Sequence, residues 1–333
     1  MTSRRAFHGF AAAVIVATVV ACGFSDAAAQ KRETMPRVGI LTPAPSAAAK
    51  PFWDAFREAM KELGYVEGKS VVYEYRSAEG QLERLPQLAA ELVKIPVKVM
   101  VVANTPGSLA AKKVTTTIPI VMVQVGDPVR VGLVSNLGRP GGNITGFTNL
   151  SGEIAAKRLQ LLKEMVPTAT RIGVIGNPGD PIALIQIQDA EAAARELKVQ
   201  LRVFTVKEAA QLDPAFDAAR SWQAQALMRL ADPLAASLRT RTIELAAKTR
   251  VPMMYSSRAD AEAGGLIGYG VDQVETYKRA AAYVDRILKG AKPGDLPVQQ
   301  PTKLELAVNL KTAAALNLKV PQAILVQADQ VIE

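Results

Sequence analysis

Histidine and cysteine supply many of the nucleophiles, general bases and metal ligands of enzymes, and this chain has almost none of either. Its 333 residues include one of each, His8 and Cys22, both close to the N-terminus. Their absence after position 22 excludes Ser-His-Asp and Cys-His catalysis, zinc sites of Cys/His type and disulfides from the rest of the chain. Dinucleotide, phosphate and calcium motifs are also missing. We therefore expect no metal and no cofactor, and much of enzyme catalysis is excluded.

The remaining candidates for chemistry lie in loops that follow apolar runs. In an open α/β sheet, ligands bind at the carboxyl ends of strands, beside helix N-termini. The loops expected at such ends are 42–51, 104–108, 124–130, 177–180, 232–233, 255–258 and 270–273.

Asn104, Thr105 and Ser108 follow the continuous apolar run 97–103 and open an expected helix. The free N–H groups of such a helix start bind anions, especially carboxylates. Plain helix capping is the alternative interpretation of the same residues.

Charged residues close two other strands. Asp127, in the turn after Gly126, could accept an amine or a hydroxyl, or could only initiate the turn. Arg258 could clamp a carboxylate with two hydrogen bonds, or could be a surface arginine. Both alternatives stay open at this point.

Aromatic residues occur at the same strand ends. Helical periodicity favours packing of Phe52 inward, which leaves Trp53 one position round the helix and free to stack on a ligand. Tyr269 ends an expected strand, between two glycines that allow close approach.

The elements that position these loops alternate along the chain. β-branched runs alternate with Ala-rich helical stretches in two blocks, near 37–125 and 171–269. Such alternation indicates βαβ units with parallel strands, so we expect two doubly wound α/β lobes. The net charge is +9, but no run of basic residues exceeds two. We therefore expect no nucleic-acid partner.

Residues 1–29 have the pattern of a secretory signal peptide. Arg4 and Arg5 precede an apolar stretch, 9–21, and an Ala-rich cleavage site lies at 27–29. A membrane anchor or a core helix is the alternative. We expect a periplasmic protein.

The form of export stays open. Cleavage before Gln30 competes with a lipobox-like sequence that would place a lipid anchor on Cys22. Residues 3–7 also resemble a twin-arginine signal.

Several local sequences together resemble one family. They are 61–69 (KELGYVEGK), 126–128 (GDP), 139–146 (RPGGNITG), 262–266 (EAGGL), 287–293 (ILKGAKP) and 303–306 (KLEL). Nearly the whole chain after the signal peptide resembles a substrate-binding protein of an ABC transporter. It is similar to proteins of the type I periplasmic-binding fold, in the family associated with tryptophan and tyrosine uptake.

The resemblance implies two lobes joined by three crossovers, which close on a small solute without catalysis. We expect the first lobe at 36–147 plus 273–301 and the second at 148–272 plus 302–333, with the third crossover the least defined. The implied partners are a small organic solute (a carboxylate, an aromatic acid or an amino acid) and an ABC permease, and we expect a monomer. The expected ligand-binding residues are Trp53, Asn104, Thr105, Ser108, Gly126, Asp127, Asp232, Tyr255, Ser256, Arg258, Tyr269 and Asp272.

Two features depart from what the resemblance implies. The loop 42–46 is longer and richer in Ala, and Ser256 and Ser257 replace bulkier residues. The identity of the solute therefore cannot be transferred.

Two other classes of protein compete with this interpretation. An effector-binding sensor domain shares the fold but would need a DNA-binding headpiece. An exported α/β enzyme would have to work with Asp, Glu, Lys or Tyr.

Overall fold

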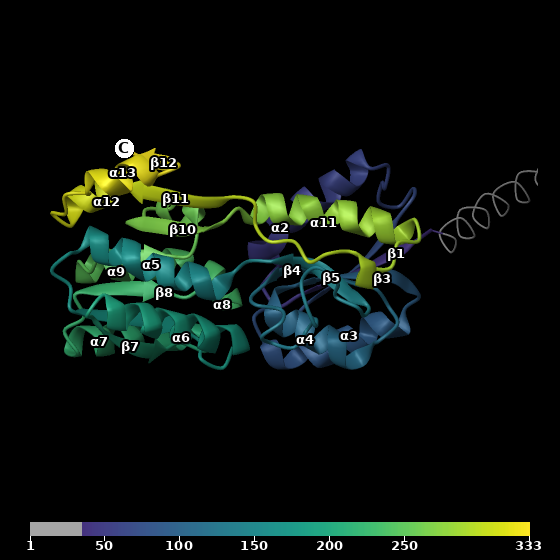
Figure 1. The fold of residues 1–333 in the computed structure, drawn as a ribbon, viewed down its shortest axis with the longest axis horizontal. Helices are drawn as coiled ribbons and strands as arrows, with labels where there is room; N and C mark the ends of the chain where they lie inside the picture. Colours follow the sequence, from purple (N-terminus) through teal and green to yellow (C-terminus); the bar gives the residue numbers. More distant parts are fainter. Residues whose placement is uncertain (1–34) are drawn as a thin grey trace, which may run out of the picture.

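The computed structural model describes residues 35–333, which form two lobes side by side (Figure 1). Each lobe is built on its own sheet. The expected signal peptide and Cys22 lie outside the described residues.

The first lobe has a five-stranded parallel sheet in the order β2-β1-β3-β4-β5. Its strands are β1 (Arg37–Thr42), β2 (Val72–Ser77), β3 (Val97–Ala103), β4 (Ile120–Val125) and β5 (Ile144–Thr148). Each of the first three strands is followed along the chain by one helix. These helices are α2 (Ser46–Glu62), α3 (Leu85–Lys94) and α4 (Asn104–Val114). Six of the seven residues of β3 are buried, as its apolar sequence predicts for a strand covered on both faces.

A helix from much later in the chain completes the first lobe. This helix, α11 (Gln273–Leu288), packs against α2 and over β3 and β4 (Figure 1). The ring of Tyr277 lies 5.5 Å from Phe52 and 4.9 Å from Trp53, between ring centroids. The Tyr65 hydroxyl donates to Asp285 Oδ1 at 3.0 Å. The core of the first lobe is therefore completed by contacts between residues more than 200 positions apart in the sequence.

The second lobe has a seven-stranded sheet in the order β12-β11-β10-β9-β8-β6-β7. Its strands are β6 (Arg171–Gly176), β7 (Gln200–Thr205), β8 (Ala226–Arg229), β9 (Met253–Tyr255), β10 (Ile267–Val271), β11 (Leu304–Asn309) and β12 (Gln330–Ile332). Its helices are α5 (Ser151–Met165), α6 (Pro181–Glu196), α7 (Leu212–Ser221), α8 (Pro233–Ser237), α9 (Arg239–Thr249), α10 (Arg258–Glu262), α12 (Leu310–Ala315) and α13 (Gln322–Gln327).

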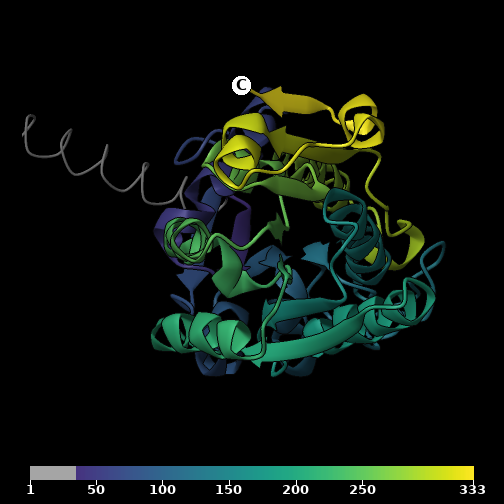
Figure 2. The ribbon, with the colours of Figure 1, turned by 90° about the vertical axis from the view of Figure 1, so that its left-hand side faces the viewer.

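The second sheet is mixed, whereas the sequence pattern predicted a wholly parallel one. β10 and β11 pair antiparallel, because the chain re-enters this sheet from the other lobe after α11. Seen from the side of this lobe, the C-terminal strands lie at one edge and the teal strand β7 at the opposite edge (Figure 2).

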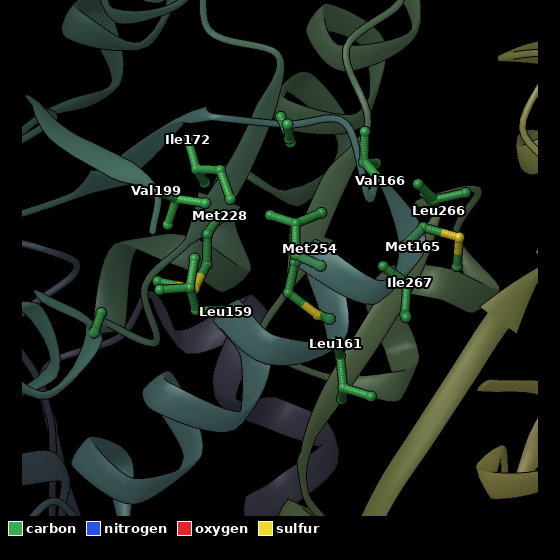
Figure 3. Close-up of a cluster of buried hydrophobic side chains, with 14 of the residues drawn as sticks. Leu159, Leu161, Met165, Val166, Ile172, Val199, Met228, Met254, Leu266 and Ile267 are labelled. Atoms are coloured by element: carbon green, nitrogen blue, oxygen red, sulfur yellow. The ribbon is translucent and has the colours of Figure 1, made fainter. Parts of the chain in front are cut away.

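The core of the second lobe lies between the sheet and α5. Leu159 and Met165 of the helix pack with Met228 and Met254 of the strands, all at most 2% exposed (Figure 3). The α/β class and the two-lobed arrangement are thus confirmed.

The chain passes between the lobes in three places. These are the segments from β5 to α5, from β10 to α11, and from the short turn Pro293–Asp295 to β11. The first and third lie side by side, since Thr148 N–H donates to the Gln299 carbonyl at 3.0 Å. Within residues 35–333, no helix combines the length and apolar character needed to cross a membrane.

Candidate functional site

A cavity of about 70 Å³ lies between the two lobes, at the carboxyl ends of their strands. The first lobe lines it from the loops after β3 and β4, and the second from the loops after β6, β8 and β9. A neighbouring cavity of about 90 Å³ shares four residues with it, namely Phe52, Arg239, Ser257 and Gln273. The two cavities are therefore adjacent; we call them together the cleft, and the four shared residues its neck.

The first lobe offers hydrogen-bond donors to the cleft. Helix α4 begins at Asn104, and no side chain caps its first N–H groups. Thr105 Oγ1 accepts the Gly126 N–H at 3.1 Å, which ties the start of α4 to the loop after β4. Gln124 is buried, and among residues 35–333 its Nε2 has no hydrogen-bond partner. Uncapped helix N–H groups and a buried amide suit an anionic group.

The second lobe offers acceptors instead. Asp180 begins α6 and is 1% exposed; its Oδ1 accepts the Ile182 N–H at 3.0 Å. The Oδ1 atom of Asp232 accepts the N–H groups of Leu234 and Ala235 at 2.9 and 2.8 Å. For both carboxylates, Oδ2 is buried and has no partner in the described part of the chain. Two such oxygens suit a cation with several protons to donate.

The two carboxylates differ in their electrostatic surroundings. Arg229 Nη2 lies 3.6 Å from Asp232 Oδ1, whereas Asp180 forms no ion pair within residues 35–333. Burial raises the pKa of Asp180 to about 7; the Ile182 N–H opposes this, and the charge of Asp232 adds to it. The pKa of Asp180 therefore lies near neutral pH.

An arginine is fixed in the neck of the cleft. Arg239 Nε donates to Asp260 Oδ1 at 2.7 Å. The other oxygen of Asp260 accepts the N–H and the hydroxyl of Ser257, at 3.0 and 2.7 Å. The Arg239 side chain is 31% exposed and lines both cavities, as Phe52 of the first lobe also does.

A second arginine does not line the cleft but binds the backbone of a residue that does. Arg158, on α5, is 3% exposed and donates from Nε to the Tyr269 carbonyl at 2.6 Å and from Nη2 to the Ser256 carbonyl at 3.0 Å. Burial lowers the pKa of its guanidinium to about 10. Arg158 thereby links α5 to the ends of β9 and β10.

The structure brings together five of the expected ligand-binding residues. The cavity of about 70 Å³ between the lobes is lined by Asn104, Thr105, Gly126, Asp232 and Ser256.

The positions of Phe52 and Trp53 are the reverse of the expectation. Trp53 is 1% exposed and packs edge-on against Phe56, Tyr75 and Tyr277, whereas Phe52 lines the cleft. The reason is that α11 covers the face of α2 that a short sequence window leaves exposed.

Three expected residues are absent from the lining of this cavity and have structural partners instead. Asp127 Oδ1 accepts the Arg130 N–H at 3.0 Å, which is the turn-forming alternative. Arg258 pairs with Glu305 at 2.9 Å and Glu262 at 3.2 Å and lines the neighbouring cavity. Asp272 caps α11 and lines that same cavity.

The other three lie away from the cleft. Tyr255, the last residue of β9, is 3% exposed in a hydrophobic cluster with Leu245 and Met253. Tyr269 packs against the core cluster that contains Leu159 and Met228. Ser108 is fully buried in α4, and its hydroxyl has no partner among the described residues.

Sequence reasoning did not select several residues of the lining. Gln124, Asp180 and Gln273 lie in loops that it had placed at strand ends, so a search for buried amides and carboxylates there could have found them. The sequence gives no local sign of a binding role for residues on a crossover or inside a helix. Four such residues also line the cavity, namely Asn149, Ser151, Ile182 and Arg239.

Comparison with known proteins agrees with this geometry. Residues 37–332 match the family model described as ABC transporter substrate binding protein. A tyrosine-binding protein of Clostridioides difficile is 26% identical over 264 residues, covering 79% of this chain and 76% of that protein.

Two crystal structures show a similar fold. A conserved domain protein from Vibrio cholerae is 29% identical, with a TM-score of 0.84, over 90% of this chain and 100% of that one. An ABC domain from Streptococcus pneumoniae in complex with L-Trp is 24% identical, with a TM-score of 0.81, over 89% of this chain and 100% of that one. The chain therefore belongs to the family of ABC transporter substrate-binding proteins, which capture small solutes for ABC permeases, are extracytoplasmic in general and are not enzymes.

Proposed function

We propose that this protein captures a zwitterionic α-amino acid between its two lobes and delivers it to an ABC permease. One observation supports this most directly: the unpartnered buried polar atoms on the two sides of the cleft are of opposite kind. Within residues 35–333, Gln124 contributes a free donor from the first lobe, and Asp180 and Asp232 contribute free acceptors from the second. A solute with one anionic and one cationic end complements both sides.

The carboxylate of the solute binds at the start of α4. The uncapped N–H groups near Asn104 and Thr105 and the amide of Gln124 donate to it. An enclosed carboxylate needs several donors to offset its desolvation, and a helix N-terminus provides them together with a favourable dipole.

The ammonium group binds between Asp180 and Asp232. Asp232 already has Arg229 beside it, so the cation chiefly neutralises Asp180. A buried carboxylate without a partner is costly, and an ammonium that donates to it removes that cost.

The side chain of the solute passes the neck between Phe52 and Arg239. It extends towards the cavity lined by Arg258 and Asp272. An aromatic ring fits this neck, because it can stack on Phe52 and accept a cation–π contact from Arg239. The tyrosine-binding relative supports an aromatic amino acid as the first candidate.

The remaining parts of the proposal concern the whole molecule. The protein is non-catalytic, monomeric and periplasmic, and it is exported by the N-terminal signal. Its lobes, 36–147 plus 273–301 and 148–272 plus 302–333, close over the solute about crossovers near 146–149, 270–273 and 299–303. Each crossover lies at the end of a strand or the start of a helix, where a few backbone positions can absorb a rotation.

Calorimetry with L-tyrosine and two analogues tests the proposal. Tyramine lacks the carboxylate, and 3-(4-hydroxyphenyl)propionate lacks the amine. Each should bind at least about thirtyfold more weakly than L-tyrosine, because it leaves one set of buried groups unpaired. A panel of the other amino acids, screened by thermal shift, follows if tyrosine does not bind.

Asp232→Asn should weaken binding of the amino acid and leave binding of the amine-free analogue nearly unchanged. Asp217→Asn, at an exposed position of the same lobe, is the matched control. The proposal fails if no amino acid binds, or if the amine-free acid binds as tightly as the amino acid.

A further inference from the structure

A second set of contacts joins the lobes outside the residues that line the solute cavity. Arg130, in the loop after β4 of the first lobe, reaches α6 of the second. Its Nη2 donates to Gln188 Oε1 at 2.7 Å, and its Nη1 lies 3.4 Å from Asp189 Oδ1. Both charged side chains keep partial exposure, 42% for Arg130 and 33% for Asp189. The contact is therefore an ion pair at the edge of the lobe interface.

Each partner is held in place by its own lobe. The Arg130 N–H donates to Asp127 Oδ1 at 3.0 Å, and the Val131 N–H donates to the Asp127 carbonyl at 3.1 Å, so the loop is a closed turn. Asp189 lies over Gly152 at the start of α5, where a Cβ would come within 2.0 Å of Asp189 Oδ2. The backbone of Arg130 and the side chain of Asp189 thus each contact residues of their own lobe.

The same loop contacts α6 at a second point. A Cβ on Gly126 would lie 1.9 Å from Ile182 Cδ1, so the backbone of the first lobe touches a side chain of the second. Ile182 precedes Gln188 by almost two helical turns, so the loop 126–130 runs along α6. An ion pair of this length does not survive a separation of the lobes by more than a few ångströms.

We propose that Arg130 is a positioning residue that stabilises the closed form through Asp189 and Gln188 and raises solute affinity without touching the solute. This inference rests on the proposed closure of the lobes, but not on the identity of the solute. Partly exposed pairs contribute modestly, so removing this one should lower the closed-to-open ratio about two- to fivefold. Because the closed form holds the solute, the same factor should appear in the dissociation constant.

The direct test measures closure without any solute. From residue 23 onward the chain has no cysteine, so Glu83→Cys in the first lobe and Glu208→Cys in the second can carry a fluorophore pair at exposed positions. Energy transfer then reports the closed-to-open ratio of the ligand-free protein. Arg130→Gln should lower this ratio by the stated factor at low salt. At about 1 M NaCl, where screening acts within about 3 Å, most of the difference should disappear.

Two further variants separate the pair from a general loss of charge. Asp189→Asn should lower the ratio by a similar factor, and combining it with Arg130→Gln should add little, because the two side chains act through one contact. Arg220→Gln removes an arginine whose partner Asp217 is in the same lobe, and should have no effect.

Titration with L-tyrosine provides a second readout. In Arg130→Gln, the dissociation constant should rise by the factor measured with the fluorophores. If no amino acid binds, the proposed solute is wrong, while the fluorophore measurement still tests the role of Arg130. An unchanged ratio in Arg130→Gln, additive effects in the double variant, or an equal effect of Arg220→Gln would overturn the inference.

Discussion

Asp180 combines deep burial, an unpartnered oxygen among the described residues and a raised pKa, so its protonation should affect stability. Its pKa rises from the ordinary 3.8 to about 7 on folding. Between these values the folded protein holds a proton that the unfolded chain has released, so Asp180 lowers the unfolding free energy as pH rises from about 4 to 7.

Asp180→Asn should therefore leave stability nearly unchanged at pH 4 and raise it by about 2–4 kcal/mol at pH 8. Asn keeps the helix-capping oxygen, so the charge is the main change. Urea unfolding of both proteins at pH 4, 6 and 8 measures the effect, with exposed Asp217→Asn as control. A pH-independent difference would contradict the assigned ionisation.

The same carboxyl group should make solute binding depend on pH. An ammonium favours the ionised form of Asp180, so affinity should rise with pH up to about 7 and level off above it. Near pH 6, binding should release protons, because part of Asp180 ionises when the amine arrives. Calorimetry in two buffers with different ionisation heats measures this release. In Asp180→Asn the release should vanish; its persistence there would assign it to another group.

Gly126 is the residue at which a single methyl group should prevent closure. Its Cβ would come within 1.9 Å of Ile182 Cδ1 and 2.1 Å of Ile182 Cγ1, and Ile182 is only 5% exposed. Gly126→Ala should therefore weaken solute binding at least about tenfold, and Ile182→Ala in that background should restore part of it. Calorimetry measures both effects. Gly142→Ala should be neutral, because, apart from its two chain neighbours, no atom of residues 35–333 lies within 4 Å of a Cβ added there.

At the scale of elements, two adjacent residues of α2 have different roles: Phe52 lines the cleft, and Trp53 belongs to the core. Trp53 faces α11 and the sheet, and Phe52 faces the cleft. Phe52→Ala should weaken solute binding with a small loss of stability, whereas Trp53→Ala should lower the unfolding free energy by about 3–5 kcal/mol. Denaturant unfolding and calorimetry on both variants separate the effects. A large loss of stability in Phe52→Ala together with a loss of binding in Trp53→Ala would contradict this prediction. It would favour the expectation from helical periodicity, in which Phe52 packs inward and Trp53 contacts the solute.

The two neighbouring residues also show where sequence reasoning ends. Periodicity predicted a helix over 51–63, and the observed α2 begins five residues earlier, at Ser46. It could not show that α11, more than 200 residues later, covers one face. The same limit applies to β11, whose direction depends on the path of the chain through the other lobe.

The cleft was only partly predictable for a related reason. Loops that follow strands are visible in the sequence, and five residues chosen from them line the cavity of about 70 Å³ between the lobes. Asp180 keeps one buried carboxylate oxygen without a partner among residues 35–333, whereas Asp127 accepts a hydrogen bond within its own turn. The sequence does not show this difference, because it depends on how the loops pack in the folded protein.

At the scale of the whole molecule, closure about three crossovers should change the overall dimensions. Small-angle scattering with and without L-tyrosine should give a smaller radius of gyration with solute, because the lobes approach each other. Gly126→Ala should show a smaller decrease. An unchanged radius in the wild type under saturating solute, with binding verified by calorimetry, would contradict hinge closure.

The interleaving of the two lobes along the chain has a consequence for synthesis. The first sheet is complete at residue 148, but its covering helix spans 273–288, and the second sheet receives its last strands only at 304–332. A ribosome therefore releases nearly all of the chain before either lobe can bury its full core. Neither lobe corresponds to one continuous fragment, and cutting after residue 272 would leave Trp53 and Phe56 without the helix that shields them from water.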